Sequence, residues 1–498
     1  MDVRPVRRST VRGIASHLLL IACLLSTLGS AAPAAATASY RVRMSRDSLR
    51  LSVRATLPMS GDLLLMDNTW PANIPEMDSL GWSGLVRELH VTDATGRELT
   101  ATHAGANRWK LASSVTGTVQ LAYVIDYSLL ARRDWPAPRE AAYADSNGLS
   151  FVGRSLFITT DGMGRATVAF ELPTGWRAVT AWQLQRGKAA AYHVASSADL
   201  VENLCVLTRS TPDELVAGDF HLHVIALGHW QASRAEVGNV LAPVIRDFVS
   251  MMGLARPVDY LVVLLPQMDR GGESYRHSFA LTVDSPPSVA NRAQWGGLIA
   301  HEIFHLWNGW QLHGADYPGT QWFQEGFTEY TAQTALLRAG LLSPTGFLEM
   351  LSNKLQRYRE IKTSLEAIGT HKGPPLYGGG ALTAFAFDVM VRNATANQRS
   401  LRDFWRELLR ETDGGKRAYA WKDLRAALER TAPGDWEGYY QSHVRGADPV
   451  PFDLVLPLVG LRLQRDASNV ERIDLDPMAA PAARSRWQQL VAAAKQPR

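Results

Sequence analysis

Two histidines four residues apart constrain this chain more than any other feature of its sequence. His301 and His305 belong to the stretch HEIFH, with Glu302 directly after the first. In an α-helix residues i and i+4 lie on the same face, so both imidazoles can face one ion while Glu302, one step around, flanks it. A chain with 13 histidines can also produce such a string by chance, on a helix that merely holds scattered polar residues. The stretch predicts a helix, and other residues must decide whether it binds a metal.

A third ligand is available downstream. Glu325 lies 20 residues beyond His305, which suits one helix, a turn through HGADYPGT and a second helix packed back against the first. Two histidines and one carboxylate leave a position of tetrahedral Zn²⁺ open for water, as in zinc hydrolases. Glu302 would then be the general base that takes a proton from this water. The sequence predicts one zinc ion held by His301, His305 and Glu325.

The second predicted helix carries another carboxylate on the same face. Glu329 follows Glu325 by four residues, so it can accept the outer N–H of a ligand histidine and fix its tautomer; the alternative is a solvated helix residue. The residues around both carboxylates are aromatic: Trp322, Phe323, Phe327 and Tyr330. An unpaired charge would be costly to bury there, and a bound metal gives Glu325 its reason to be present. His313 and Asp316 are expected to be loop residues, because three ligands complete the site.

The N-terminus has the layout of a secretory signal peptide. The small residues GSAAPAAATAS follow an apolar run at 14–28, which is preceded by four arginines: Arg4, Arg7, Arg8 and Arg12. We expect removal of residues 1–38, with cleavage near Ala36 or Ala38, and an exported protein, periplasmic or secreted. Cys23 ends the string LIAC, so lipoprotein anchoring is an alternative. The apolar run is too short and interrupted for a stable membrane span.

Loss of this leader changes the charge and the cysteine count. It removes four Arg and one Asp, so the formal net charge of +4 falls by 3 to +1, and no nucleic-acid partner is indicated. Of two cysteines only Cys205 remains, so the exported protein has no internal disulfide and depends on its core.

The pattern of apolar residues changes from strand-like to helical within the mature chain. From 39 to 230, short runs such as LRLSVRATL are separated by Gly, Pro, Asn and Asp, which predicts an antiparallel β domain, a sandwich or saddle. From 231 to 445 helical periodicity dominates around one buried strand, VDYLVVLLP. Residues 446–498 form a short C-terminal segment. The expected fold is α+β and multidomain, with the β domain first and a mostly helical catalytic domain second.

Several segments together resemble a known family. HEIFHLWN followed by WFQEGFTEY is similar to the glycyl aminopeptidase family of zinc metallopeptidases, gluzincins with a thermolysin-like catalytic domain. The pair Trp307–Asn308 and the EGFT block are more specific than HExxH. LYGGGALTAFAFDVMVR, residues 376–392, is similar to the family's Tyr-x-Lys-Gly segment.

The resemblance implies a role for each matching residue. The ligands and the general base are those already predicted from the spacing. Tyr377 would donate its hydroxyl to the oxyanion of the tetrahedral intermediate, which suits a phenol of pKa about 10. Asn308 and Glu329 would stand behind the ligands, and the substrate would be a peptide.

The chain departs from the family along the strand that lines the cleft. Relatives carry Gly-Gly-x-Glu-His, whose Glu grips the free α-amine of the substrate in related aminopeptidases. Here Gly271 and Gly272 match, but Ser274 and Tyr275 stand at the Glu and His positions. Glu273 is one residue early, which turns a strand side chain to the opposite face unless a bulge re-aims it. Gly271, Gly272 and Glu273 are the candidate substrate-binding residues, and a surface carboxylate is the alternative for Glu273.

Two more departures concern the helix of Tyr377 and the C-terminus. Gly379 stands where relatives have Lys, and three successive glycines are expected to loosen this helix start. Relatives continue into a PDZ domain of about 90 residues, whereas about 50 residues follow Gly446 here. We expect either a truncated remnant or a short segment packed on the catalytic domain.

The sequence as a whole indicates an exported zinc metallopeptidase, expected to be an aminopeptidase. One alternative is an endopeptidase, or a peptidase of altered specificity, that lacks the amine anchor. The other is a non-catalytic zinc protein that binds peptides. The preferred side chain, the physiological peptide and the oligomeric state are not indicated.

Overall fold

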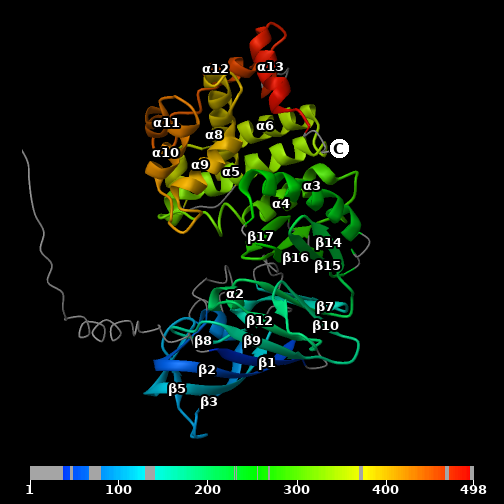
Figure 1. The fold of residues 1–498 in the computed structure, drawn as a ribbon, viewed down its shortest axis with the longest axis vertical. Coiled ribbons are helices and arrows are strands. Elements are labelled where there is room, and N and C mark those ends of the chain that lie inside the picture. The colour runs from blue at the N-terminus through cyan, green and yellow to red at the C-terminus, as the bar shows by residue number, and fades with distance from the viewer. Residues whose placement is uncertain are drawn as a thin grey trace, which may run out of the picture.

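The computed structural model has a β-rich N-terminal part and a helical C-terminal part (Figure 1). It describes residues 37–44, 49–66, 80–128, 141–228, 230, 233–254, 256–266, 270–359, 361–369, 374–465 and 470–493. The predicted leader, including Cys23, lies outside these residues except for Thr37 and Ala38. None of the helices in these ranges is long and apolar enough to cross a membrane.

The larger sheet of the N-terminal part has nine strands. They are β1 (Ala38–Met44), β2 (Arg50–Leu65), β3 (Val86–Asp93), β4 (Ala101–His103), β5 (Arg108–Asp126), β8 (Thr159–Thr160), β9 (Ala166–Glu171), β11 (Gln183–Leu184) and β12 (Ala191–Val194). The main order is β11-β12-β9-β1-β2-β5-β3, antiparallel except for the parallel β1–β9 pair. Strict alternation of buried and exposed residues in β1 buries one face of this sheet.

A second sheet lies against the buried face of the first. It comprises β6 (Ala142–Asp145), β7 (Gly148–Val152), β10 (Arg177–Thr180) and β13 (Leu204–Thr208), in the order β10-β13-β7-β6. Every residue of β7 and β13 is buried, because alternate side chains enter two different cores. A short helix, α2 (Ser197–Val201), precedes β13. This second sheet is therefore the middle layer of the molecule.

A third sheet connects this layer to the helices. Its strands are β14 (Asp213–Ala217), β15 (Phe220–Ala226), β16 (Val258–Pro266), β17 (Gly271–Tyr275) and β18 (Ser278–Val283), in the order β14-β15-β16-β18-β17. The apolar run of β16 is buried on both faces, as expected for a strand between two cores. The sheet crosses the boundary predicted at residue 230, because β15 pairs with β16 of the helical part and β14 pairs with β15.

Helices cover the other face of the third sheet (Figure 1). They are α3 (Arg234–Met252), α4 (Arg292–Phe304), α5 (Tyr317–Arg338), α6 (Pro344–Tyr358), α7 (Leu365–Ile368), α8 (Pro374–Ala394), α9 (Leu401–Glu411), α10 (Trp421–Thr431) and α11 (Trp436–His443). This arrangement confirms the predicted fold class, a β domain followed by a mostly helical domain.

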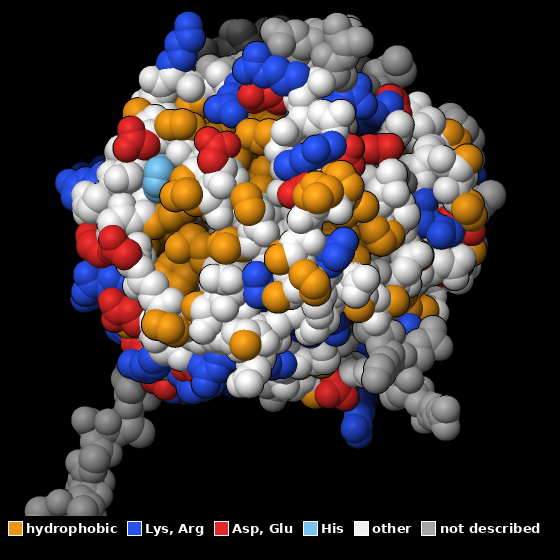
Figure 2. Space-filling view, turned by 90° about the horizontal axis from the view of Figure 1, so that it is seen from above, with side chains coloured by type: hydrophobic (Ala, Val, Ile, Leu, Met, Phe, Trp, Pro, Cys, Tyr) orange, Lys and Arg blue, Asp and Glu red, His pale blue; other side chains and the backbone are white. Residues whose placement is uncertain are grey.

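The C-terminal segment packs on the helical part. It contains α12 (Phe452–Val455), the hairpin β19 (Leu461–Arg465) and β20 (Glu471–Leu475), and α13 (Pro481–Leu490). Trp487 of α13 stacks on Phe347 of α6, with ring centroids 6.3 Å apart. The described part of this segment packs on the helical part, with Ile473, Trp487 and Leu490 in the same core. Seen from this end, the surface mixes apolar side chains with charges of both signs (Figure 2).

Candidate metal centre

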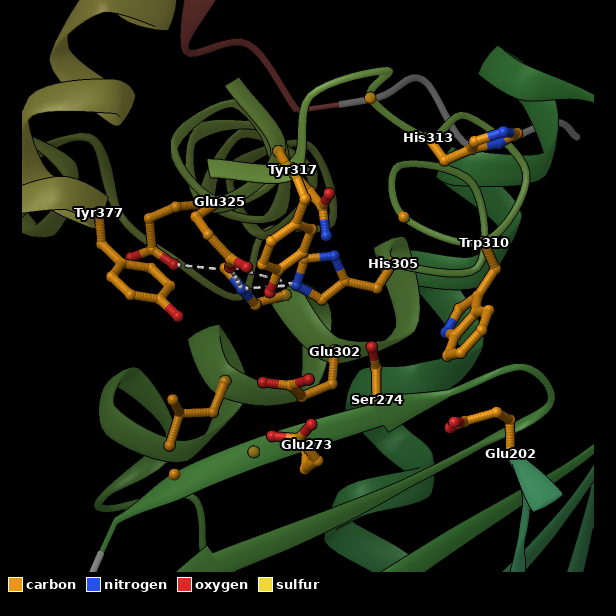
Figure 3. A pocket seen from close by; sticks show the side chains of 18 of the residues that line it. Glu202, Glu273, Ser274, Glu302, His305, Trp310, His313, Tyr317, Glu325 and Tyr377 are labelled. Carbon is orange, nitrogen blue, oxygen red and sulfur yellow. Dashed lines mark hydrogen bonds and ion pairs between the residues drawn. The ribbon is translucent and has the colours of Figure 1, made fainter. Parts of the chain in front are cut away.

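The first helix of the predicted motif is α4, and the second is α5. His301 and Glu302 stand in the last turn of α4, and His305 is its C-cap residue. The chain then turns through 306–316 and enters α5, which carries Glu325 on the face toward α4. The predicted helix–turn–helix arrangement therefore brings all three predicted ligands together, across the contact between two packed helices. Figure 3 shows two of them, His305 and Glu325, close together.

The three predicted ligands offer their atoms to one point. Nε2 of His301 lies 3.0 Å from Nε2 of His305 and 3.2 Å from Oε2 of Glu325, and Nε2 of His305 lies 3.4 Å from the same oxygen. All three residues are buried. Burial by itself raises the pKa of Glu325, but the facing histidines outweigh burial and hold this pKa well below its usual value. Two imidazole nitrogens and one carboxylate oxygen, converging in a buried place, fit Zn²⁺.

The outer nitrogens of both histidines have acceptors. Nδ1 of His301 lies 3.0 Å from Oε2 of Glu329, as predicted, and Nδ1 of His305 lies 2.8 Å from the backbone oxygen of Asn308. Protonation of each Nδ1 leaves Nε2 with its lone pair toward the metal position. The side chain of Asn308 donates instead to α5, to the backbone oxygen of Gln324 at 3.0 Å. Asn308 therefore supports the ligand His305 with its backbone carbonyl and not with its side chain.

Glu302 lies between the ligand cluster and the edge strand β17. Burial raises its pKa to about 7; the two histidines oppose this rise, and Glu273 and Glu325 add to it. A β-carbon at Gly272 would overlap the carboxylate of Glu302. Gly272 is therefore required because the carboxylate occupies the place where any other residue would have its side chain.

Strand β17 presents its two faces to different surroundings. It pairs with β18 in regular register, Ser274 opposite Phe279 and Glu273 opposite Ala280. Phe279 belongs to the core under the helices, whereas Ala280 belongs to the core between the second and third sheets. Ser274 therefore shares the face of Gly272, toward Glu302, and Glu273 shares the opposite face. No bulge re-aims Glu273 in this paired strand.

Tyr377 approaches the cluster from α8. Its ring centroid lies 5.7 Å from that of His301, and its hydroxyl points toward the ligands (Figure 3). Burial, followed by the charges of Glu325 and Glu302, raises the pKa of this phenol, so it stays protonated.

The three glycines after Tyr377 allow α8 to approach its neighbours closely. They lie inside the helix, and a β-carbon at Gly380 would meet the backbone of Trp322 and Gly326 in α5. A β-carbon at Gly379 would meet Leu365 and Tyr358. The glycines allow close packing, which fixes the helix of Tyr377 against the helix of Glu325.

The three predicted ligands, Glu302, Glu329, Tyr377 and residues 271–274 line a cavity of about 510 Å³. Beyond the predicted residues, its lining includes four that the sequence analysis missed: Arg154, Glu202, Trp310 and Tyr317. Arg154 and Glu202 come from the β domain, about 100 residues or more before the motif, and no local pattern marks them. Tyr317 points from the start of α5 toward the ligands (Figure 3). His313 lies exposed at the rim, and Asp316 is the N-cap residue of α5.

Comparisons with known proteins agree with this geometry. One family model, M61 glycyl aminopeptidase, matches residues 294–367, and another, the peptidase M61 N-terminal domain, matches residues 80–203. A comparison with curated protein sequences finds no match.

Solved structures share the fold at low sequence identity. An aminopeptidase N family protein from Idiomarina loihiensis is 19% identical with a TM-score of 0.73, over 87% of this chain and 81% of that one. An M1 zinc metallopeptidase from Deinococcus radiodurans is 15% identical with a TM-score of 0.55, over 83% and 95%. A structure of such an enzyme with a Tyr-Ser-Ala substrate is 16% identical with a TM-score of 0.54, over 83% and 95%. Two segments of the chain thus match models of the M61 glycyl aminopeptidase family, its fold is aminopeptidase N-like, and it is a zinc metallopeptidase.

Proposed function

We propose that this protein is an exported aminopeptidase that holds one zinc ion at His301, His305 and Glu325 and uses Glu302 as its general base. The observation that carries the proposal is the convergence of three buried ligand atoms directly beside a buried carboxylate that is not among them. When bound, zinc polarises the peptide carbonyl and lowers the pKa of water. Glu302 accepts the proton of the attacking water and passes it to the leaving amine nitrogen as the C–N bond breaks. Tyr377 donates to the carbonyl oxygen as that oxygen gains negative charge.

Replacing Glu302 tests this mechanism. Glu302→Gln keeps the size of the side chain but removes the proton acceptor, so we expect kcat to fall by at least about 10³-fold, with zinc content unchanged. Metal analysis and peptide hydrolysis on the same preparation check both parts. Retained hydrolysis would exclude Glu302 as the base.

The far end of the cavity supports recognition of a free amine. Arg154 pairs with Glu202 at 4.0 Å, and Glu273 lies near enough to raise the pKa of Arg154 further. One guanidinium and two carboxylates leave this cluster with a net charge of −1, which favours a cationic group of the substrate. Glu202 would receive the ammonium in place of a carboxylate at position 274; Glu273 also lines the cavity, but it starts from the opposite face of β17.

Ser274 favours a second candidate, an endopeptidase. This neutral side chain stands on the site face of β17, where the family's Glu would stand. Comparing each peptide with its N-acetylated form separates the two candidates. We expect acetylation to lower kcat/KM by at least about 100-fold. It converts the positively charged amine, which would pair with the carboxylates, into a neutral amide. We also expect Glu202→Gln to lower kcat/KM for the free peptide only. Equal cleavage of free and acetylated peptides would establish the endopeptidase.

Export is proposed from the leader. Strand β1 begins at Ala38, so cleavage near Ala36 or Ala38 would leave the β domain nearly whole. We expect the full chain, expressed in a Gram-negative host, to be recovered outside the cytoplasm with its mass reduced by that leader. A mature N-terminus at Cys23 would indicate the lipoprotein form, and an unprocessed cytoplasmic chain would contradict export.

A further inference from the structure

A lysine from a neighbouring helix lies behind the metal centre. Nζ of Lys354, on α6, is 2.5 Å from Oε1 of Glu329 on α5. The side chains of Lys354 and Glu329 are only 14% and 20% exposed. An ion pair in such a place is screened less by solvent than a surface pair, so its geometry is more strongly held.

The carboxylate of Glu329 is held at both of its oxygens. Oε2 faces Nδ1 of His301 at 3.0 Å, while Oε1 accepts from Lys354 and from Nε2 of Gln333, both at 2.5 Å. Gln333 stands one turn further along α5, so its contact fixes Glu329 to its own helix. Lys354 supplies the contact that reaches a second helix. Rotation of the carboxylate away from His301 would break the contacts at Oε1.

The C-terminal segment fixes the helix that carries Lys354. The backbone N–H of Ile473 in β20 donates to Oγ of Ser352 at 2.9 Å, and Arg359 pairs with Glu471 at 2.9 Å. These contacts lie on either side of Lys354 along α6. The position of Lys354 is therefore set by residues that follow the metal motif by more than about 100 positions.

We propose that Lys354 is a positioning residue of the metal centre: it holds Glu329 against His301, and the C-terminal segment holds Lys354. This inference rests on the proposed zinc site and adds a support that the ligand motif does not contain. Groups behind the ligands typically contribute 10- to 100-fold to metal affinity, because they fix the orientation of the ligand rings.

The affinity for zinc, measured by competition with a chromophoric chelator, tests the proposal. We expect Lys354→Met and Lys354→Gln to weaken zinc binding about tenfold, and Lys354→Arg to retain most of the affinity. Lys416→Met is the matched control, because Lys416 pairs with Asp413 in an ion pair that is 77% and 76% exposed. This control should leave zinc affinity unchanged.

The sign of the effect makes the test decisive. A bare positive charge opposes the binding of a divalent cation, so its removal alone would tighten zinc binding. Unchanged or tighter binding in folded Lys354→Met and Lys354→Gln would overturn the positioning role. If Lys354 acts through Glu329, adding Lys354→Met to Glu329→Gln should weaken zinc binding little further. A double variant that loses the full zinc affinity of both single changes would show that Lys354 does not act through Glu329. Failure of the unmodified protein to bind zinc would instead contradict the proposed function.

Discussion

Single atoms of the ligand residues decide how this metal centre can work. Each histidine has two nitrogens, and the structure gives the outer one an acceptor, Glu329 for His301 and the carbonyl of Asn308 for His305. The inner nitrogens then face Glu325. Because Glu325 is only 4% exposed, its charge must be met by the histidines or by a metal. The same spacing on a helix without these acceptors would leave the imidazoles free to rotate.

Tyr377 gives a prediction at the residue scale. Tyr377→Phe removes one hydroxyl from a buried ring, so we expect kcat to fall by about 10²–10³-fold, the cost of losing one donor to the developing oxyanion. The KM of the same peptide should change by less than about threefold, since the aromatic ring remains in the lining of the cavity. Steady-state kinetics check both values. A loss confined to KM would exclude the oxyanion role.

Helices α5 and α8 approach each other most closely at glycines, while large side chains such as Phe327 and Phe387 join them elsewhere. Gly326 and Gly380 face each other so closely that a β-carbon on either would overlap the backbone of the other helix. One of these helices carries Glu325 and the other Tyr377, so this contact sets the distance between the proposed ligand and the proposed oxyanion donor. A run of glycines that weakens an isolated helix therefore fixes this pair.

Gly380→Ala tests this contact at the scale of elements. The added methyl group has to push two backbones apart, so we expect a loss of about 1–3 kcal/mol in the free energy of unfolding. Gly297→Ala in α4 is the control, since a β-carbon there meets nothing within 4 Å, and it should stabilise by up to about 1 kcal/mol. Urea unfolding of the zinc-free proteins measures both. Equal stability of Gly380→Ala and the unmodified protein would show that the helices can separate at no cost.

The whole molecule consists of four layers in succession: the nine-stranded sheet, the second sheet, the third sheet and the helices. Strands β7 and β13 of its second sheet are buried on both faces, which ties the β domain to the catalytic part. Arg154 and Glu202 reach the active-site cavity from this β domain. The C-terminal segment packs against α6, at the end of the helical part that lies away from the β domain (Figure 1). The cavity therefore depends on parts of the chain from both sides of the motif.

Trp487→Ala tests the C-terminal segment at this scale. Trp487 is 7% exposed and packs on α6, so its removal should cost about 3 kcal/mol and lower the Tm of the catalytic part. Met478→Ala, at a position 87% exposed in the same segment, should change the stability by less than about 0.5 kcal/mol. Calorimetry compares the variants. An unchanged Tm in Trp487→Ala would mean that the segment folds independently of the catalytic part.

Local geometry explains what could be predicted. The ligands His301, His305 and Glu325 and the orienting Glu329 follow from the four-residue repeat of a helix and from one helix–turn–helix spacing. The fold class follows from period and turn composition in the same way. The face of Glu273 could be stated only conditionally, because a single bulge would reverse it and bulges leave no reliable mark in one sequence.

By itself, the sequence determined the order of a β domain before a helical one, and it predicted the candidate metal ligands and general base, since these depend on residues close together in the chain. Only the tertiary structure decided which sheet holds β14 and β15, that the glycines of α8 pack against neighbouring helices, and that Arg154, Glu202 and Lys354 gather around the site. Each of these depends on contacts between residues far apart in sequence. Such contacts are chosen by the packing of whole layers, and no local pattern encodes them.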